Sequence, residues 1–234
     1  MTETRHRENP KSSQLRFVDV SVACAAVATL FLVVIAFGRL TTDLGWDADT
    51  KAAASASVTF FGHLVGVIFL VWYLRKRGLG TGLNRLRKDA WHLLWEAPLL
   101  IIVATITSAL VAEFVLNLPL PERNTQEALT MPPAVHAVRF ITAALVVPLF
   151  EELVFRRIFM RYLDRFLPAL LSIVLSAVVF AAVHFNPSVM VGTFIAGIGL
   201  ALVARRHRSL WASVIVHSCN NSFAYLLLLT AMLE

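Results

Sequence analysis

The feature that most restricts the fold of this chain is a series of long apolar segments separated by short polar ones. The chain has 234 residues, of which 58% are hydrophobic, whereas soluble domains are nearer 45–50% apolar. An α-helix needs about 20 consecutive apolar residues to cross a bilayer. We therefore predict an all-α, polytopic membrane bundle with about seven transmembrane helices. The predicted spans are residues 18–38, 56–74, 93–117, 138–163, 168–185, 187–204 and 209–232.

The Lys and Arg residues are distributed unevenly over this layout. Of the 21, 17 lie in four segments that share one side of the membrane if the N-terminus is cytoplasmic. This bias is typical of the cytoplasmic loops of membrane proteins, so it explains the net charge of +6 without a nucleic-acid partner. We expect a multi-pass protein of the cell (plasma) membrane, embedded in the lipid bilayer, with a cytoplasmic N-terminus. The four basic segments are the N-terminal tail, 75–88, 156–165 and 205–208.

Three polar motifs interrupt the apolar segments. The adjacent carboxylates of Glu151 and Glu152 fall in the fourth predicted span, and His184 lies near the end of the fifth. His217 and Asn221 lie in the seventh. A charge at a helix centre costs roughly 2.5–3.5 kcal/mol on insertion scales, so these residues demand an explanation. Counted from the cytoplasmic turns at a rise of 1.5 Å per residue, Glu151, His184 and Asn221 lie within about 6 Å of one another in membrane depth. On the same count His217 lies about one helical turn closer to the cytoplasm. We predict that they meet in one buried polar site.

Spacing within the predicted helices indicates how some of these side chains pair. Glu152 and Arg156 are four residues apart, so they can form an ion pair on one helix face. This structural role is the alternative to direct chemistry for Glu152. Phe180 and His184 also share a face, which would place the aromatic ring against the imidazole. Taken singly, each histidine is equally compatible with a structural hydrogen-bonding role.

Together these residue types support the activation of a water molecule for hydrolysis. A buried carboxylate is a competent general base near neutral pH. Imidazoles bind a metal ion or orient water, and an asparagine amide can stabilise an oxyanion. The zinc-protease motif H-E-x-x-H is absent. Four further acids and histidines in or near the predicted spans are interpreted as structural, and these are His63, His92, Glu96 and Glu113.

The order of the three motifs resembles that of the CPBP intramembrane protease family, which contains the type II CAAX prenyl endopeptidases and the Abi proteins. The family pattern is E-E-x-x-x-R, then F-x-x-x-H, then H-x-x-x-N, and this chain has all three in that order. The resemblance covers about 138–225. It implies one continuous membrane domain with two parts: residues 1–137, a tail with three leading helices, and residues 138–234, the catalytic core.

The resemblance also implies roles for individual residues. Glu151 would be the general base, and His184 would help it to hold the attacking water or a metal ion. His217 and Asn221 would serve as metal ligand or oxyanion stabiliser, and Glu152 is included in the catalytic set. A tentative ligand set of Glu151, His184 and His217 would suffice for zinc, or another divalent metal, with an open position. The supporting residues would be Arg156 and Phe180.

We therefore predict an intramembrane endopeptidase, a hydrolase of the metalloprotease type if a metal assists, which uses a Glu-activated water to cut a peptide or membrane-protein substrate. Two alternatives remain open. One is a catalytically inactive membrane scaffold, and the other is an ion- or proton-coupled transporter, because buried acids and histidines also build proton relays. Peptide hydrolysis would identify the endopeptidase, and pH-driven flux in liposomes without hydrolysis would identify the transporter. The sequence decides neither the substrate, including whether it is prenylated, nor the oligomeric state.

Overall fold

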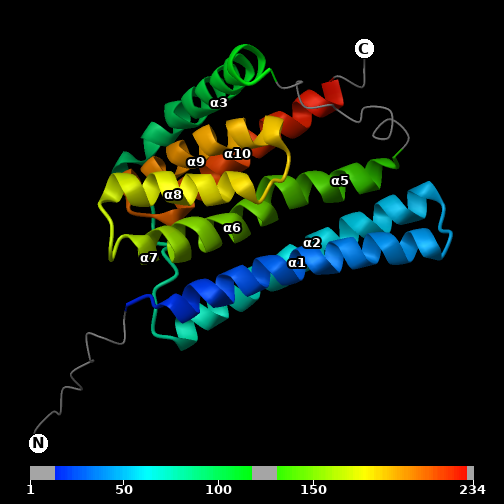
Figure 1. The fold of residues 1–234 in the computed structure, drawn as a ribbon, viewed down its shortest axis with the longest axis horizontal. Helices are drawn as coiled ribbons and strands as arrows, with labels where there is room; N and C mark the ends of the chain where they lie inside the picture. Colours follow the sequence, from blue (N-terminus) through cyan, green and yellow to red (C-terminus); the bar gives the residue numbers. More distant parts are fainter. Residues whose placement is uncertain (1–13, 118–130, 231–234) are drawn as a thin grey trace, which may run out of the picture.

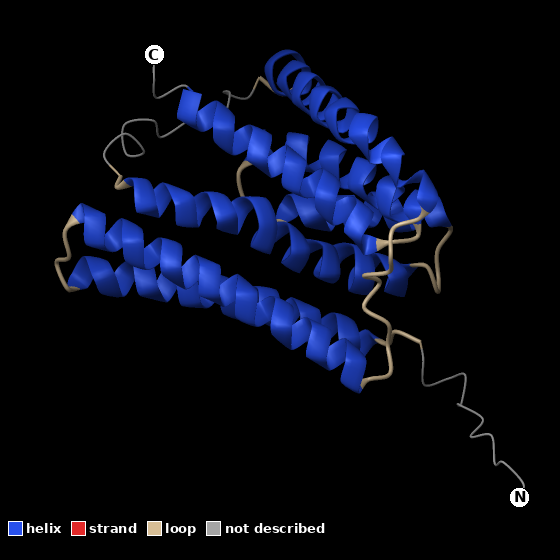
Figure 2. Cartoon of the chain, turned by 180° about the vertical axis from the view of Figure 1, so that it is seen from behind, coloured by secondary structure: helices blue, strands red, loops and turns tan. Residues whose placement is uncertain are grey.

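The computed structural model describes residues 14–117 and 131–230, and within these ranges every regular element is helical (Figures 1 and 2). The all-α, multi-pass fold predicted from the sequence is confirmed, with five helices in the described ranges long and apolar enough to cross a membrane. The N-terminal elements are α1 (Phe17–Asp43), α2 (Ala48–Lys76), the short η1 (Lys88–His92), α3 (Leu93–Leu110) and η2 (Val111–Val115). The C-terminal ones are α8 (Ala169–Ala182), α9 (Pro187–His207) and α10 (Leu210–Thr230).

Between these two groups runs one long helical segment, hereafter the central helix, from Pro133 to Leu163. It contains two stretches with the wider π-helical turn, of a kind often found at functional sites. Pro148 follows the first of them closely, and its ring nitrogen has no hydrogen to donate to the helix ladder. The elements of the central helix are α5 (Pro133–Ile141), η3 (Thr142–Val146), α6 (Val147–Glu151), η4 (Glu152–Met160) and α7 (Arg161–Leu163).

The helices are arranged in layers around the central helix. The antiparallel pair α1 and α2 covers one side of it, and α8, α9 and α10 cover the other (Figure 1). Helix α3 packs on the outer side of α9 and α10. A buried apolar cluster, which includes Leu70, Phe150, Leu153, Ile158 and Phe180, joins α2, the central helix and α8. The central helix is therefore enclosed by protein and can carry charged groups away from lipid.

Several helix ends differ from the predicted spans, among them the start of α2 and the end of α8. Helix α2 begins at Ala48, earlier than the predicted residue 56, because the Asp47 carboxylate caps it by accepting a hydrogen bond from the Thr50 N–H (2.9 Å). Helix α8 ends at Ala182, and its 14 residues span only about 21 Å at 1.5 Å each. His184 therefore lies in the turn after α8 and not on the predicted helix.

The described residues of the basic segments gather at one end of the bundle, which we call the basic end. There the start of α1 meets the end of α2, because Asp19 pairs with Arg77 (3.1 Å). The loop after α2 meets the start of α10, since the Leu210 N–H donates to the Gly82 carbonyl (2.8 Å). The charge clustering that the sequence indicated is thus present in three dimensions.

Candidate active site

The two adjacent glutamates point to different sides of the central helix. Successive residues of an α-helix are about 100° apart around its axis, so neighbours cannot share a face. Glu152 is fully buried, whereas Glu151 is partly exposed and lines a cavity between the central helix and the α1–α2 pair. The two carboxylates therefore have different surroundings although they are neighbours in sequence.

His217 on α10 connects the two carboxylates. Its Nδ1 lies 3.1 Å from Glu152 Oε1, and its Nε2 lies 3.5 Å from Glu151 Oε2. The imidazole is only 4% exposed, so these contacts are shielded from bulk water. The sequence-based estimate placed His217 one turn lower in the membrane than Glu151, and it is wrong. It assumed that the helices have their cytoplasmic ends at equal height. His217 is level with the glutamates.

The cavity that Glu151 lines holds two further imidazoles. It has a volume of about 350 Å³, and its polar wall includes Glu151, His63 of α2 and His184. The Nδ1 of His184 lies 2.9 Å from the Phe180 carbonyl, and the Nδ1 of His63 lies 2.8 Å from the Thr59 carbonyl. A carbonyl only accepts, so each Nδ1 carries the hydrogen. In the neutral ring this leaves Nε2 as an acceptor for a ligand or a water molecule.

Phe180 contacts several members of the site. Its ring meets the imidazoles of His184 and His217 edge-on, with ring centroids 5.2 and 5.7 Å apart. The guanidinium carbon of Arg156 lies 4.2 Å from the centre of the same ring, within the range of a cation–π contact. The predicted contact between the Phe180 ring and the His184 imidazole is present although His184 lies beyond the end of α8, and Phe180 also contacts residues of two other helices.

Arg156 is buried beneath the glutamates. Its side chain is 1% exposed, and its Nη1 lies 3.0 Å from Glu152 Oε1, which is the ion pair expected from their spacing. Its Nη2 donates to the carbonyl of Gly197 on α9 (3.3 Å). A Cβ at Gly197 would lie 3.1 Å from both Ala177 Cβ and Phe180 Cδ1, so glycine lets α9 approach closely enough for this bond. Glu152, Arg156 and His217 form one buried polar network.

Asn221 lies apart from the cavity wall. Its amide nitrogen donates to the carbonyl of Ala143 in the π-helical stretch η3 (3.0 Å), and it is not among the residues that line the cavity. This bond holds α10 against the central helix one turn beyond His217. Oxyanion stabilisation by Asn221 stays a prediction.

The predicted metal ligands are not assembled into one set. Within residues 14–117 and 131–230, no three His, Cys, Asp or Glu side chains are placed so that they could hold a metal ion. Glu151 and His217 face each other, but His217 is also bound to Glu152 through Nδ1, and the Nδ1 of His184 is bound to the Phe180 carbonyl of α8. Zinc or another divalent metal stays a prediction from the resemblance.

Three of the four residues interpreted as structural have structural surroundings. Glu96 pairs with Arg206 (2.9 Å) and His207 (2.7 Å), which ties α3 to α9. His92 stacks on Trp91 and accepts a hydrogen bond from Trp95 Nε1 (3.0 Å), and Glu113 is exposed. His63 is the exception, because the sequence interpretation missed that it lines the same cavity as Glu151. Its position inside an apolar span was the only signal that could have marked it.

These features define a class of protein: a multi-pass helical membrane protein with a glutamate–histidine centre enclosed by its helices. Residues 133–223, from the first residue of α5 into α10, match the family model described as type II CAAX prenyl endopeptidase Rce1-like. The resemblance predicted from the three motifs is therefore confirmed over this segment, which is similar to the type II CAAX prenyl endopeptidases. No curated protein and no solved structure matches the chain. Helices α1 to α3, including His63, lie outside the matched segment.

Proposed function

We propose that this protein is an intramembrane endopeptidase that hydrolyses a peptide bond with a water molecule activated by Glu151. The observation that supports this most is the cavity in which a partly exposed carboxylate faces the same space as His63 and His184. His217 lies 3.5 Å behind that carboxylate. A general base with acceptor groups beside it is the arrangement that water activation requires.

In this mechanism the Glu151 carboxylate takes a proton from water while the water oxygen attacks the carbonyl carbon of the scissile peptide bond. The proton then passes to the leaving amine, whose bond to that carbon breaks. The remaining O–H of this water is donated to Nε2 of His184 or of His63, each of which has its Nδ1–H bonded to a backbone carbonyl, and this bond holds the nucleophile. His217 orients Glu151, and Glu152 fixes His217 in turn.

The rest of the cavity wall suits a substrate that is apolar. Val27, Leu30 and Val34 of α1 line it, together with Phe150 and Phe155 of the central helix. An extended peptide from a membrane protein, or one with a hydrophobic attachment, would bury its apolar groups there. The family name supports a peptide substrate, and the bilayer is the surrounding phase.

His63→Phe tests the imidazole that lies outside the matched segment. Phenylalanine keeps an aromatic ring against Phe150, whose ring centroid lies 5.5 Å from that of His63, but it removes Nε2. We expect kcat to fall about 10–100-fold, because a poorly held water is no longer aligned for attack. The measurement is the rate of peptide cleavage by purified protein in lipid nanodiscs. If the variant cleaved the peptide at the parent rate, His63 would have no role in the mechanism.

His184→Gln tests the proposed function itself. Purified protein is incubated with a peptide library, and the products are identified by mass spectrometry. We expect the parent to release new carboxyl termini and the variant to be slower by about 100-fold. His92→Gln is the matched control, since His92 lies outside the cavity. Equal cleavage by parent and His184→Gln would contradict the assignment, as would proton flux in liposomes without any hydrolysis.

A further inference from the structure

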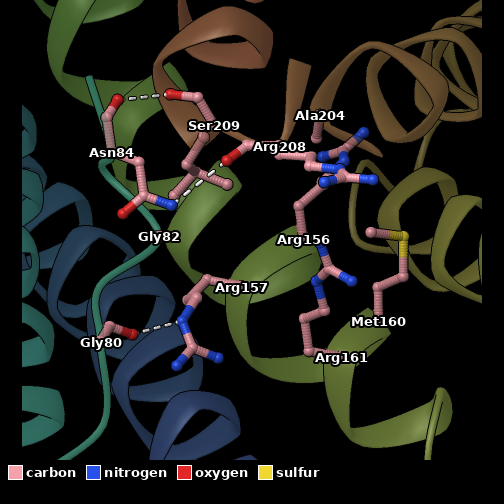
Figure 3. Close-up of a pocket in the computed structure, with 11 residues that line it drawn as sticks. Gly80, Gly82, Asn84, Arg156, Arg157, Met160, Arg161, Ala204, Arg208 and Ser209 are labelled. Atoms are coloured by element: carbon pink, nitrogen blue, oxygen red, sulfur yellow. Dashed lines mark hydrogen bonds between the residues drawn. The ribbon is translucent and has the colours of Figure 1, made fainter. Parts of the chain in front are cut away.

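A second cavity, which shares no lining residue with the proposed peptidase cavity, lies at the basic end of the bundle (Figure 3). Its volume is about 310 Å³, enough for on the order of ten water molecules at about 30 Å³ each. Among the residues that the structure describes, its wall contains four arginines and no aspartate or glutamate. The arginines are Arg156, Arg157 and Arg161 of the central helix and Arg208 before α10.

The loop after α2 builds one side of this cavity. Gly82 has a φ of +78°, which glycine adopts without steric penalty. The Arg157 side chain crosses it, since a Cβ at Gly82 would lie 3.0 Å from Arg157 Cδ. Arg157 Nε donates to the Gly80 carbonyl, and Ser209 Oγ donates to the Asn84 carbonyl (2.7 Å) (Figure 3). The wall is thus held in place before any ligand arrives.

The positive charge of this wall is only partly neutralised. Arg156 pairs with Glu152, and Arg161 lies 3.4 Å from Asp164. Among the described residues, neither Arg157 nor Arg208 has a carboxylate partner within ion-pair distance. The start of α10 also borders the cavity, and the positive end of its helix dipole faces this region. The cavity therefore attracts anions.

Arg156 supplies an independent indication of a ligand. Its side chain is 1% exposed, yet within the described structure its Nε has no hydrogen-bond partner. A buried donor left unsatisfied is destabilising, and more so when the group is charged. Arg156 lines this cavity, so an anion there would lie beside a buried guanidinium whose hydrogen-bonding capacity is not filled.

We propose that this cavity binds a phosphate group, either the headgroup of an anionic phospholipid or free phosphate. Guanidinium groups form paired, charge-assisted hydrogen bonds to phosphate oxygens, and basic pockets between transmembrane helices are suited to anionic headgroups. The bound phosphate contacts Arg156, Arg161 and Arg208. Because Arg156 also holds Glu152, and Glu152 holds His217, the ligand stabilises the network behind the proposed active site.

The test measures thermal unfolding of the purified full chain in neutral detergent, so it does not depend on the proposed activity. Short-chain phosphatidylglycerol, short-chain phosphatidylcholine and inorganic phosphate are titrated separately at constant ionic strength. We expect phosphatidylglycerol or phosphate to raise Tm by several degrees and phosphatidylcholine to have no effect. A rise with phosphatidylglycerol alone identifies a lipid headgroup, and a rise with both identifies phosphate as sufficient.

Two double variants distinguish phosphate binding in this cavity from general attraction of anions to the basic end. Arg161→Gln with Arg208→Asn removes two exposed arginines of the wall, and asparagine tolerates the left-handed backbone of Arg208 (φ 51°). Arg75→Gln with Arg85→Gln removes the same charge from the same end outside the cavity. We expect the wall variant to lose at least half of the Tm shift and the control pair to keep it. Equal shifts in the two double variants, or no anion-specific shift in the parent, would overturn the proposal.

Discussion

Glu151→Gln is expected to lower the kcat of peptide hydrolysis by about 10²–10⁴-fold, the usual contribution of a general base. The amide has the size of the carboxylate but cannot take a proton from water. Glu151 is partly exposed to a cavity, so the exchange leaves no buried charge unpaired and the protein should remain folded. The measurement is kcat and KM for one peptide substrate, with Tm measured on the same sample.

Glu113→Gln is the matched control for this prediction, since Glu113 is exposed on η2. It should leave kcat, KM and Tm unchanged. A fall in kcat for Glu151→Gln with unchanged KM indicates loss of an interaction made only in the transition state. If Glu151→Gln cut as fast as the parent, Glu151 could not be the base and the proposed mechanism would fail.

The largest stability effect is expected when one member of the Glu152–Arg156 pair is removed. Glu152→Met or Arg156→Met alone should lower the free energy of unfolding by about 3–5 kcal/mol, because the remaining charge is buried without its partner. The two residues are 0% and 1% exposed, so water cannot solvate that charge. The double variant with methionine at both positions should regain most of the loss, because no charge is then left unpaired. Denaturant unfolding in detergent micelles gives the four free energies of this cycle.

Arg87→Met is the control for the stability cycle. Arg87 pairs with Asp89 (3.5 Å), but its side chain is 55% exposed, and exposed pairs contribute only about 0–1 kcal/mol. A loss of that small size for Glu152→Met would mean that the buried pair does not stabilise the fold. The double variant should still be inactive even when stable, because His217 has lost the carboxylate that holds its Nδ1.

Much of the fold was predictable because the bilayer constrains it strongly. Apolar segments of about 20 residues have few alternatives to membrane helices, and the bias of Arg and Lys toward four segments indicated which ends lie together. Helix ends were less predictable. The Asp47 cap extends α2, and α8 stops at Ala182 so that His184 enters a turn. Such endings depend on side-chain hydrogen bonds and chain reversals that hydropathy does not detect.

What the sequence determined by itself is the membrane class, the resemblance of residues 133–223 to the CAAX proteases and the pair Glu152–Arg156, since these depend on local pattern and spacing. Only the tertiary structure decided that Glu151 and Glu152 face different surroundings, that His217 bridges them, and that His63 shares the cavity with Glu151. These relations depend on the relative height and rotation of separate helices. Packing between helices fixes both quantities, and the spacing of residues along one helix contains neither.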